Sequence, residues 1–200
     1  MTHPRSTAPE IPAMLMFLAT MATADAAPTT YELSGLLYVQ VFKDPDTLAS
    51  DLSHDHVVRA KGWTGTATWD PEAPGSCKMD ISVPVAQLEV DDPGMRSKVG
   101  LEGALDDLDG DTYLSITWKG GGCAVKGDKV EMTGEMTIHG TSKKLTVSLD
   151  MGGDGSTFHA KGGTKLKATD YGFQPFTAMF GALANQNEMP LVVAIEGKAK

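Results

Sequence analysis

Apolar and polar side chains alternate along most of the chain from Tyr31 onward. Successive side chains of a β-strand point to opposite faces of a sheet, so a period of two predicts strands with one apolar and one polar face. Seven segments show this pattern: 63–69, 79–85, 114–118, 130–139, 144–151, 158–167 and 191–195. Such strands are typical of an antiparallel sheet that has one face in water.

The segments between these strands are short and rich in Gly, Asp and Pro, as in Gly152-Gly-Asp-Gly155. Short turns predict sequential hairpins, so we expect an all-β, single antiparallel meander. About eight such strands bury their apolar face by closing into a barrel or by folding into a sandwich. Two segments, near 93–108 and 173–187, interrupt the alternation and predict short helices, the second because Phe176, Met179, Phe180 and Leu183 have helical spacing.

The predicted inward positions are almost all apolar. They include Trp63, Val83, Ile116, Trp118, Met132, Met136 and Phe158. Methionine adapts to irregular apolar guests but also fills gaps in an ordinary core. An eight-stranded barrel is either filled by side chains or hollow, and the pattern alone does not separate the two.

The N-terminal segment differs from the rest. An apolar run over 11–22 is too short to span a bilayer, and Ala24-Asp25-Ala26 follows it as an A-x-A cleavage pattern. We interpret residues 1–26 as a signal peptide and 27–200 as one exported domain, periplasmic or secreted. The basic n-region is weak, because Arg5 is its only basic side chain and Glu10 offsets its charge. A disordered apolar tail or a misassigned start site is the alternative.

Composition and net charge argue against some classes of binding partner. The 200 residues are 41% apolar and 22% charged, with a formal net charge of −9. One domain fits this length, and the acidic balance argues against nucleic acid and against anionic lipid. After the first thirty residues no apolar stretch approaches eighteen residues, so we expect no transmembrane segment.

The chain contains two cysteines, and we predict a disulfide between Cys77 and Cys123. Antiparallel pairing of the strand that begins near Cys77 with the strand that ends near Cys123 brings the two together. The alternation puts Cys77 opposite residue 122 or 124, so a one-residue bulge in Gly120-Gly-Gly122 is needed to correct the register. Two unrelated buried thiols in a reducing compartment are the alternative.

Three segments resemble motifs of the YceI-like family. Residues 132–145 (MTGEMTIHGTSKKL) are similar to the family hairpin G-x-L-T-I-H-G-x-T-K, 113–118 (YLSITW) to its strand Y-P-x-I-x-F, and 169–173 (TDYGF) to its S-D-F-G-V segment. The resemblance covers roughly Tyr31 to Ala199. It implies a lipocalin-like barrel, usually exported, that holds a polyisoprenoid or an isoprenoid quinone in its lumen. Leu114 stands where the family has proline, and a longer stretch over 43–56 replaces the short first hairpin.

The resemblance gives the aromatic and methionine positions a second interpretation as lumen-lining residues. In that case Phe176, Met179 and Phe180 cover the mouth of the barrel. An exposed apolar segment of this kind is alternatively a homodimer contact.

His54-Asp55-His56 is the sharpest local signal for chemistry. On a strand, residues i and i+2 share a face, so both imidazoles can reach one metal ion or one polar head group. The simpler interpretation is a pair of histidines that bond to loop backbone at a strand entrance. Two ligands rarely suffice for a metal, so we assign none.

Nothing else in the chain predicts catalysis. It has no G-x-S-x-G, no H-E-x-x-H and no phosphate loop, and we expect neither an enzyme nor a cofactor. The function we expect is an exported carrier of an isoprenoid lipid or quinone. A metal-dependent envelope enzyme that uses His54 and His56, and a structural β-domain with a filled core, are the alternatives.

Overall fold

The computed structural model describes residues 28–91, 105 and 108–200. The expected signal peptide lies outside the described residues. So does most of the helix expected near 93–108, of which only Leu105 and Leu108 are described. In the described part of the chain, no helix is long and apolar enough to cross a membrane.

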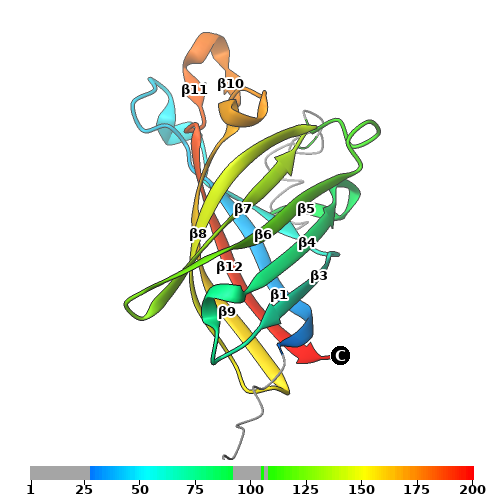
Figure 1. Cartoon of the computed structure of the whole chain (residues 1–200). Helices are drawn as coiled ribbons and strands as arrows, with labels where there is room; N and C mark the ends of the chain where they lie inside the picture. Colours follow the sequence, from blue (N-terminus) through cyan, green and yellow to red (C-terminus); the bar gives the residue numbers. More distant parts are fainter. Residues whose placement is uncertain (1–27, 92–104, 106–107) are drawn as a thin grey trace, which may run out of the picture.

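The fold is an antiparallel barrel (Figure 1). Its eight strands are β1 (Thr29–Val41), β3 (Thr64–Trp69), β4 (Lys78–Pro84), β6 (Ser115–Lys126), β7 (Lys129–Ile138), β8 (Thr141–Gly153), β9 (Thr157–Lys167) and β12 (Glu188–Ala199). Each pairs with the next in this order, and β12 pairs with β1 to close the barrel. The predicted all-β meander, closed into a barrel of about eight strands, is confirmed.

Strand β1 takes part in three pairings. One edge pairs with β12 along most of its length, and the other pairs first with β3 and then with β2 (His56–Ala60). Strand β5 (Leu88–Val90) extends the sheet beyond β2. Gly35 lies between the two pairings with φ +118°, and a Cβ there would lie 2.6 Å from the Ala194 carbonyl oxygen. This position therefore requires glycine.

The alternation correctly predicts which side chains face inward. The buried core contains, among others, Ala67, Trp69, Met79, Val83, Trp118, Val130, Val147, Leu149, Phe158, Ala160, Val193 and Ile195. For Leu114 the prediction is wrong. The alternation over 114–118 places Leu114 on the inward face, but this residue precedes β6 and its side chain is exposed. The inward alternation of that strand begins at Ile116, which packs against the core.

The helix expected near 173–187 is reduced to one 3-10 turn. The segment contains the two-stranded hairpin of β10 (Thr177–Ala178) and β11 (Leu183–Ala184), joined by η6 (Met179–Gly181). Met179, Phe180 and Gly181 all have positive φ, of 51°, 56° and 87°. A right-handed helix cannot continue through such residues, so the helix predicted from the spacing of the apolar side chains does not form.

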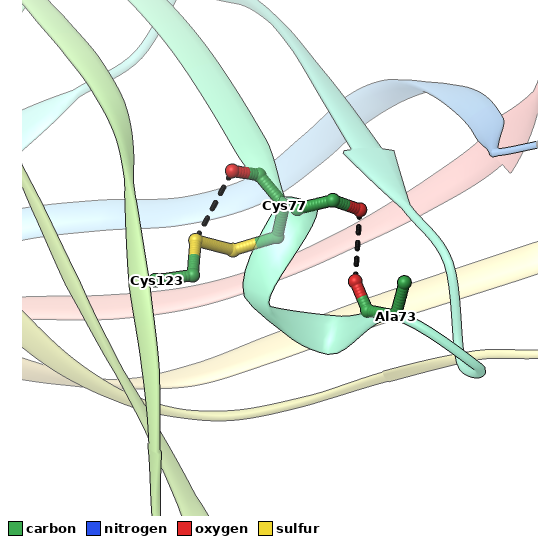
Figure 2. Close-up of a disulfide and its surroundings, with 4 residues drawn as sticks. Ala73, Cys77 and Cys123 are labelled. Carbon is green, nitrogen blue, oxygen red and sulfur yellow. Dashed lines mark hydrogen bonds between the residues drawn. A yellow bond between two sulfur atoms is a disulfide. The ribbon is translucent and has the colours of Figure 1, made fainter.

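The other helical elements whose bounds lie within the described part of the chain are also single 3-10 turns. They are η1 (Ser50–Leu52), η2 (Pro74–Ser76), η3 (Val85–Gln87) and η5 (Ala168–Tyr171). The turn η2 leads directly into Cys77, and the Ser76 hydroxyl donates to the Ala73 carbonyl oxygen at 2.8 Å (Figure 2).

The predicted disulfide is confirmed. Cys77 and Cys123 are bonded, with their Cα atoms 6.0 Å apart, and the Cys123 sulfur lies 3.1 Å from the Cys77 carbonyl oxygen (Figure 2). The predicted bulge is also present, since the β6–β7 register shifts between Gly120 and Gly122. One extra residue in β6 turns Cys123 toward Cys77.

Candidate functional site

One end of the barrel is filled by large side chains. Tyr31 stacks on Phe158 with ring centroids 5.3 Å apart, and Trp69 lies 6.4 Å from the same ring. Met132 is completely buried. The Tyr31 hydroxyl accepts a hydrogen bond from the Gly155 amide in the β8–β9 turn, which ties this turn to the core. We call this the filled end.

The other half of the barrel is hollow. It encloses a cavity of about 270 Å³. That is slightly below the range of about 300 to 1,000 Å³ typical of ligand pockets and far larger than the space one water molecule needs. The wall is built from inward side chains of the strands, among them Leu37, Val39, Ile81, Val83, Ile116, Trp118, Met136, Val147, Leu149 and Val193.

No charged side chain is among the described residues that line this cavity. The polar residues among them, Tyr38, Gln174, Asn185 and Gln186, are neutral. Gln186 is held at the entrance, because its backbone amide donates to the Phe42 carbonyl oxygen and its side-chain amide donates to that of Lys43. An uncharged wall with a few amides suits an apolar guest with a neutral polar end.

The cavity reaches the protein surface beside β10. Phe176 lines the cavity although its side chain is 60% exposed. The backbone here is tied down, since the Asn185 amide donates to the Phe176 carbonyl oxygen at 2.9 Å. We call this opening the mouth of the cavity.

The structure divides the predicted ligand-binding residues into three groups. Val83, Ile116, Trp118, Met136 and Phe176 line the cavity. Met132 and Phe158 pack in the filled end, and Trp63 packs against the core from outside the cavity wall. Phe180, His54 and His56 also lie outside the lining, and the first two are exposed.

The two histidines are not brought together on one strand. His54 precedes β2, whereas His56 begins it. His56 Nδ1 lies 2.7 Å from Asp91 Oδ2, and the other carboxylate oxygen of Asp91 accepts from the Val57 amide. This arrangement fastens the start of β2 to the end of β5. In the described part of the chain no three His, Cys, Asp or Glu side chains cluster in a way that could hold a metal ion.

One ion pair, between Lys165 and Glu188, lies outside the cavity lining. Lys165 Nζ donates to Glu188 Oε1 at 2.6 Å, and this bond lowers the pKa of the Glu188 carboxyl. Tyr171, in the turn η5, is buried, and burial together with the Asp170 charge raises the pKa of its phenol above the ordinary value. It therefore stays a neutral phenol at physiological pH.

Several cavity residues were not among the predicted site residues. Ile81, Val147, Leu149 and Val193 were assigned inward by alternation, which does not distinguish the hollow half from the filled half. Tyr38, Asn185 and Gln186 have no sequence signal, because they depend on how the segments around the mouth are held in space.

A model of the YceI-like domain matches residues 44–196. The chain belongs to the YceI-like family. The UPF0312 protein of Photorhabdus laumondii is 26% identical over 149 residues, covering 68% of this chain and 70% of that protein. Protein YceI of Escherichia coli O157:H7 is 24% identical over 153 residues, covering 68% and 71%.

Solved structures of similar proteins have the same fold. BcnA of Burkholderia cenocepacia superimposes with a TM-score of 0.60 at 19% identity, covering 80% of this chain and 95% of BcnA. The YCEI protein of Campylobacter jejuni gives 0.56 at 20% identity, covering 72% and 84%. At these identities the likeness supports the barrel fold alone. Membership of the YceI-like family together with this barrel is consistent with a binding protein.

Proposed function

We propose that this protein is an exported carrier that binds one apolar chain, an isoprenoid lipid or an isoprenoid quinone, in the hollow half of the barrel. The observation that carries the proposal is the cavity itself, which is apolar, has no charged side chain among the described residues that line it, and is open beside Phe176. The family resemblance supports the isoprenoid class, since the cavity chemistry alone suits any long apolar chain.

Burial of the guest supplies the binding energy. Each CH₂ group removed from water contributes about 0.8 kcal/mol, so a chain of several isoprene units gains several kcal/mol. The neutral amides of Asn185 and Gln186 in the lining suit a hydroxyl or a quinone carbonyl at the end of the chain. The guest is held without bond making, so this function is not enzymatic.

Export is supported by two features. Residues 1–26 have the pattern of a signal peptide. The Cys77–Cys123 disulfide suits an oxidising compartment, such as the periplasm or the cell exterior.

Native mass spectrometry of protein purified without detergent tests the carrier function. We expect one co-purifying lipid mass per chain. Val83→Phe is expected to fold and to lose this lipid, because the added ring occupies space that the guest would fill. Val130→Phe makes the same change at a buried position that does not line the cavity. It is expected to cost about 1–3 kcal/mol of stability through overpacking.

Two results would contradict the proposal. One is a wild-type protein that is folded and carries no lipid even after incubation with geranylgeraniol or a short-chain ubiquinone. The other is a folded Val83→Phe variant that retains as much lipid as the wild type.

A further inference from the structure

Large apolar side chains are exposed around the mouth of the cavity. Five of them, Leu48, Leu52, Phe176, Met179 and Phe180, form what we call the mouth patch. They come from two segments, the loop 42–55 (cyan) and the β10–β11 hairpin (orange), which lie side by side at one end of the barrel (Figure 1). Hydrogen bonds join these segments, from the Ala49 amide to the Ala182 carbonyl oxygen and from the Asp44 amide to that of Ala184.

The hairpin tip holds its side chains outward. Met179 and Phe180 have left-handed φ values of 51° and 56°, which bulky side chains seldom adopt. The Phe180 side chain is fully exposed, and neither Phe180 nor Met179 lines the cavity. Backbone strain of this kind concentrates at functional positions, and here it presents an aromatic ring and a thioether to the surroundings.

The mouth patch is continuous with the cavity. Phe176 belongs to both, because it is exposed on one side and lines the cavity on the other. An apolar surface that covers the patch would therefore connect directly with the apolar wall of the cavity. A chain passing between the two would not have to cross water.

The charges around the patch restrict what can bind there. Residues 171–187 contain no Asp, Glu, Lys or Arg. The neighbouring loop 42–55 carries four aspartates (44, 46, 51 and 55) against one lysine, Lys43, and the whole chain has a formal charge of −9. An anionic lipid surface would be repelled, and an electroneutral surface would not.

The hairpin tip is too small to hold a second copy of the chain by itself. The hairpin strands are only two residues long, and the tip presents chiefly Met179 and Phe180. A large aromatic side chain buries about 150–250 Å², whereas each partner in a stable dimer buries about 800 Å². A projecting tip of two apolar side chains is suited instead to the interfacial region of a bilayer, where aromatic rings are favoured.

We propose that the mouth patch docks the barrel on the surface of a zwitterionic lipid bilayer, with Met179 and Phe180 inserted at the interface, so that the cavity mouth faces the lipid. The proposal rests on the proposed carrier function, because it states where the apolar guest enters and leaves. Docking itself is a property of the empty protein and is measured without any guest.

Co-sedimentation with sucrose-loaded phosphatidylcholine vesicles tests the docking. We expect residues 27–200 to bind these vesicles and the same chain with Met179→Ser/Phe180→Ser to bind at least about tenfold more weakly, since two large apolar groups are lost. Val125→Ser is the matched control. Val125 is also exposed, at 55%, but it lies in the β6–β7 hairpin and outside the patch. Its substitution is expected to leave vesicle binding unchanged.

A variant that gains a signal on binding distinguishes a loss of docking from a loss of folding. In Phe180→Trp the new indole should be quenched by phosphatidylcholine brominated on its acyl chains. Trp63, Trp69 and Trp118 are in the wild type as well, so the wild-type signal is subtracted. At low salt, binding to phosphatidylglycerol vesicles is expected to be weaker than to phosphatidylcholine, and the difference should shrink as salt is added.

Three outcomes would overturn the docking proposal. They are equal vesicle binding by the wild type and the Met179→Ser/Phe180→Ser variant, no quenching of the Phe180→Trp variant, or a wild-type dimer in analytical ultracentrifugation that the double substitution dissociates. The carrier function is judged separately by the co-purifying lipid mass. Lipid retention without vesicle binding refutes only the docking, and vesicle binding without lipid retention refutes only the carrier function.

Discussion

Met132 and Met136 lie four residues apart on the same face of β7 and have different surroundings. Met136 lines the cavity, whereas Met132 is completely buried in the filled end. A Cβ at Gly120 would lie 2.5 Å from the Met132 sulfur, which shows how tightly that end is packed. Alternation correctly places both side chains inside the barrel. It cannot tell which one meets empty space, because that depends on the side chains that other strands bring to the same level.

A single carboxylate organises the turn between β8 and β9. Asp154 Oδ1 accepts hydrogen bonds from the backbone amides of Thr157 and Ser156 and from both of their hydroxyls. These bonds, led by the Thr157 amide, lower the pKa of Asp154 well below its usual value. The sequence indicates a turn at this position, but the four-bond arrangement around one oxygen is visible only in the structure.

We predict that Asp154→Ala lowers the melting temperature at pH 7. A depressed carboxyl pKa contributes stability above the pKa of the unfolded chain, about 3.9, and this contribution is lost as the pH falls toward the folded-state value. The difference in melting temperature between wild type and variant should therefore be constant from pH 8 to 5 and shrink below about pH 4. Asp128→Ala, in the exposed β6–β7 turn, is the control. A difference that grows on acidification would contradict this account.

At the scale of the element, the β10–β11 segment shows where a sequence pattern misleads. Phe176, Met179, Phe180 and Leu183 match a helical period, but the strands pair as a short hairpin and the tip is left-handed. Hydrogen bonds to the 42–55 loop select this conformation. That loop is distant in sequence, so no local pattern can report its influence.

Two phenylalanines of this segment differ in their position relative to the cavity. Phe176 lines the cavity mouth, while Phe180 points into solvent and lies outside the cavity lining. We predict that Phe176→Ser speeds release of the bound lipid, because it opens the mouth, and that Phe180→Ser leaves unchanged the rate of release into cyclodextrin, a soluble acceptor that offers no lipid interface. Neither change should move the melting temperature of the lipid-free protein by more than about 2 °C, since both rings are largely exposed. Stopped-flow transfer of a fluorescent isoprenoid measures the rates. A collapse of stability in Phe176→Ser would place this ring in the core instead.

At the scale of the whole molecule, the sequence predicts the barrel but does not predict its cavity. Alternation and short turns predict the meander and its inward face, and the register that a Cys77–Cys123 bond requires predicts the bulge at 120–122. The extra pairing of β2 with β1 and β5 follows no such pattern, since a long loop separates β1 from β2. Whether a barrel is hollow depends on the sum of side-chain volumes around a closed ring. That sum requires the strand register, which the sequence does not reveal.

The disulfide lies outside the cavity lining, so its contribution to stability can be measured separately from lipid binding. Cys77 is fully buried and Cys123 packs against the core, and neither lines the cavity. A cross-link that spans 46 residues contributes roughly 4 kcal/mol by limiting the unfolded chain. We predict that reduction lowers the melting temperature markedly and leaves the stoichiometry of bound lipid unchanged at temperatures where the protein stays folded.

Three measurements check this prediction. Alkylation of the unfolded, unreduced protein should add no mass, whereas reduction should allow two alkyl groups to be added. A reductant titration followed by thermal unfolding gives the loss of stability, with Cys77→Ala/Cys123→Ala as the variant that no longer responds to reductant. Native mass spectrometry of the reduced protein then counts the lipid. Because the bond lies outside the cavity wall, its loss should destabilise the barrel as a whole without changing the cavity. Lipid release on reduction, while the barrel stays folded, would contradict this prediction, because the disulfide would then be needed to keep the shape of the cavity.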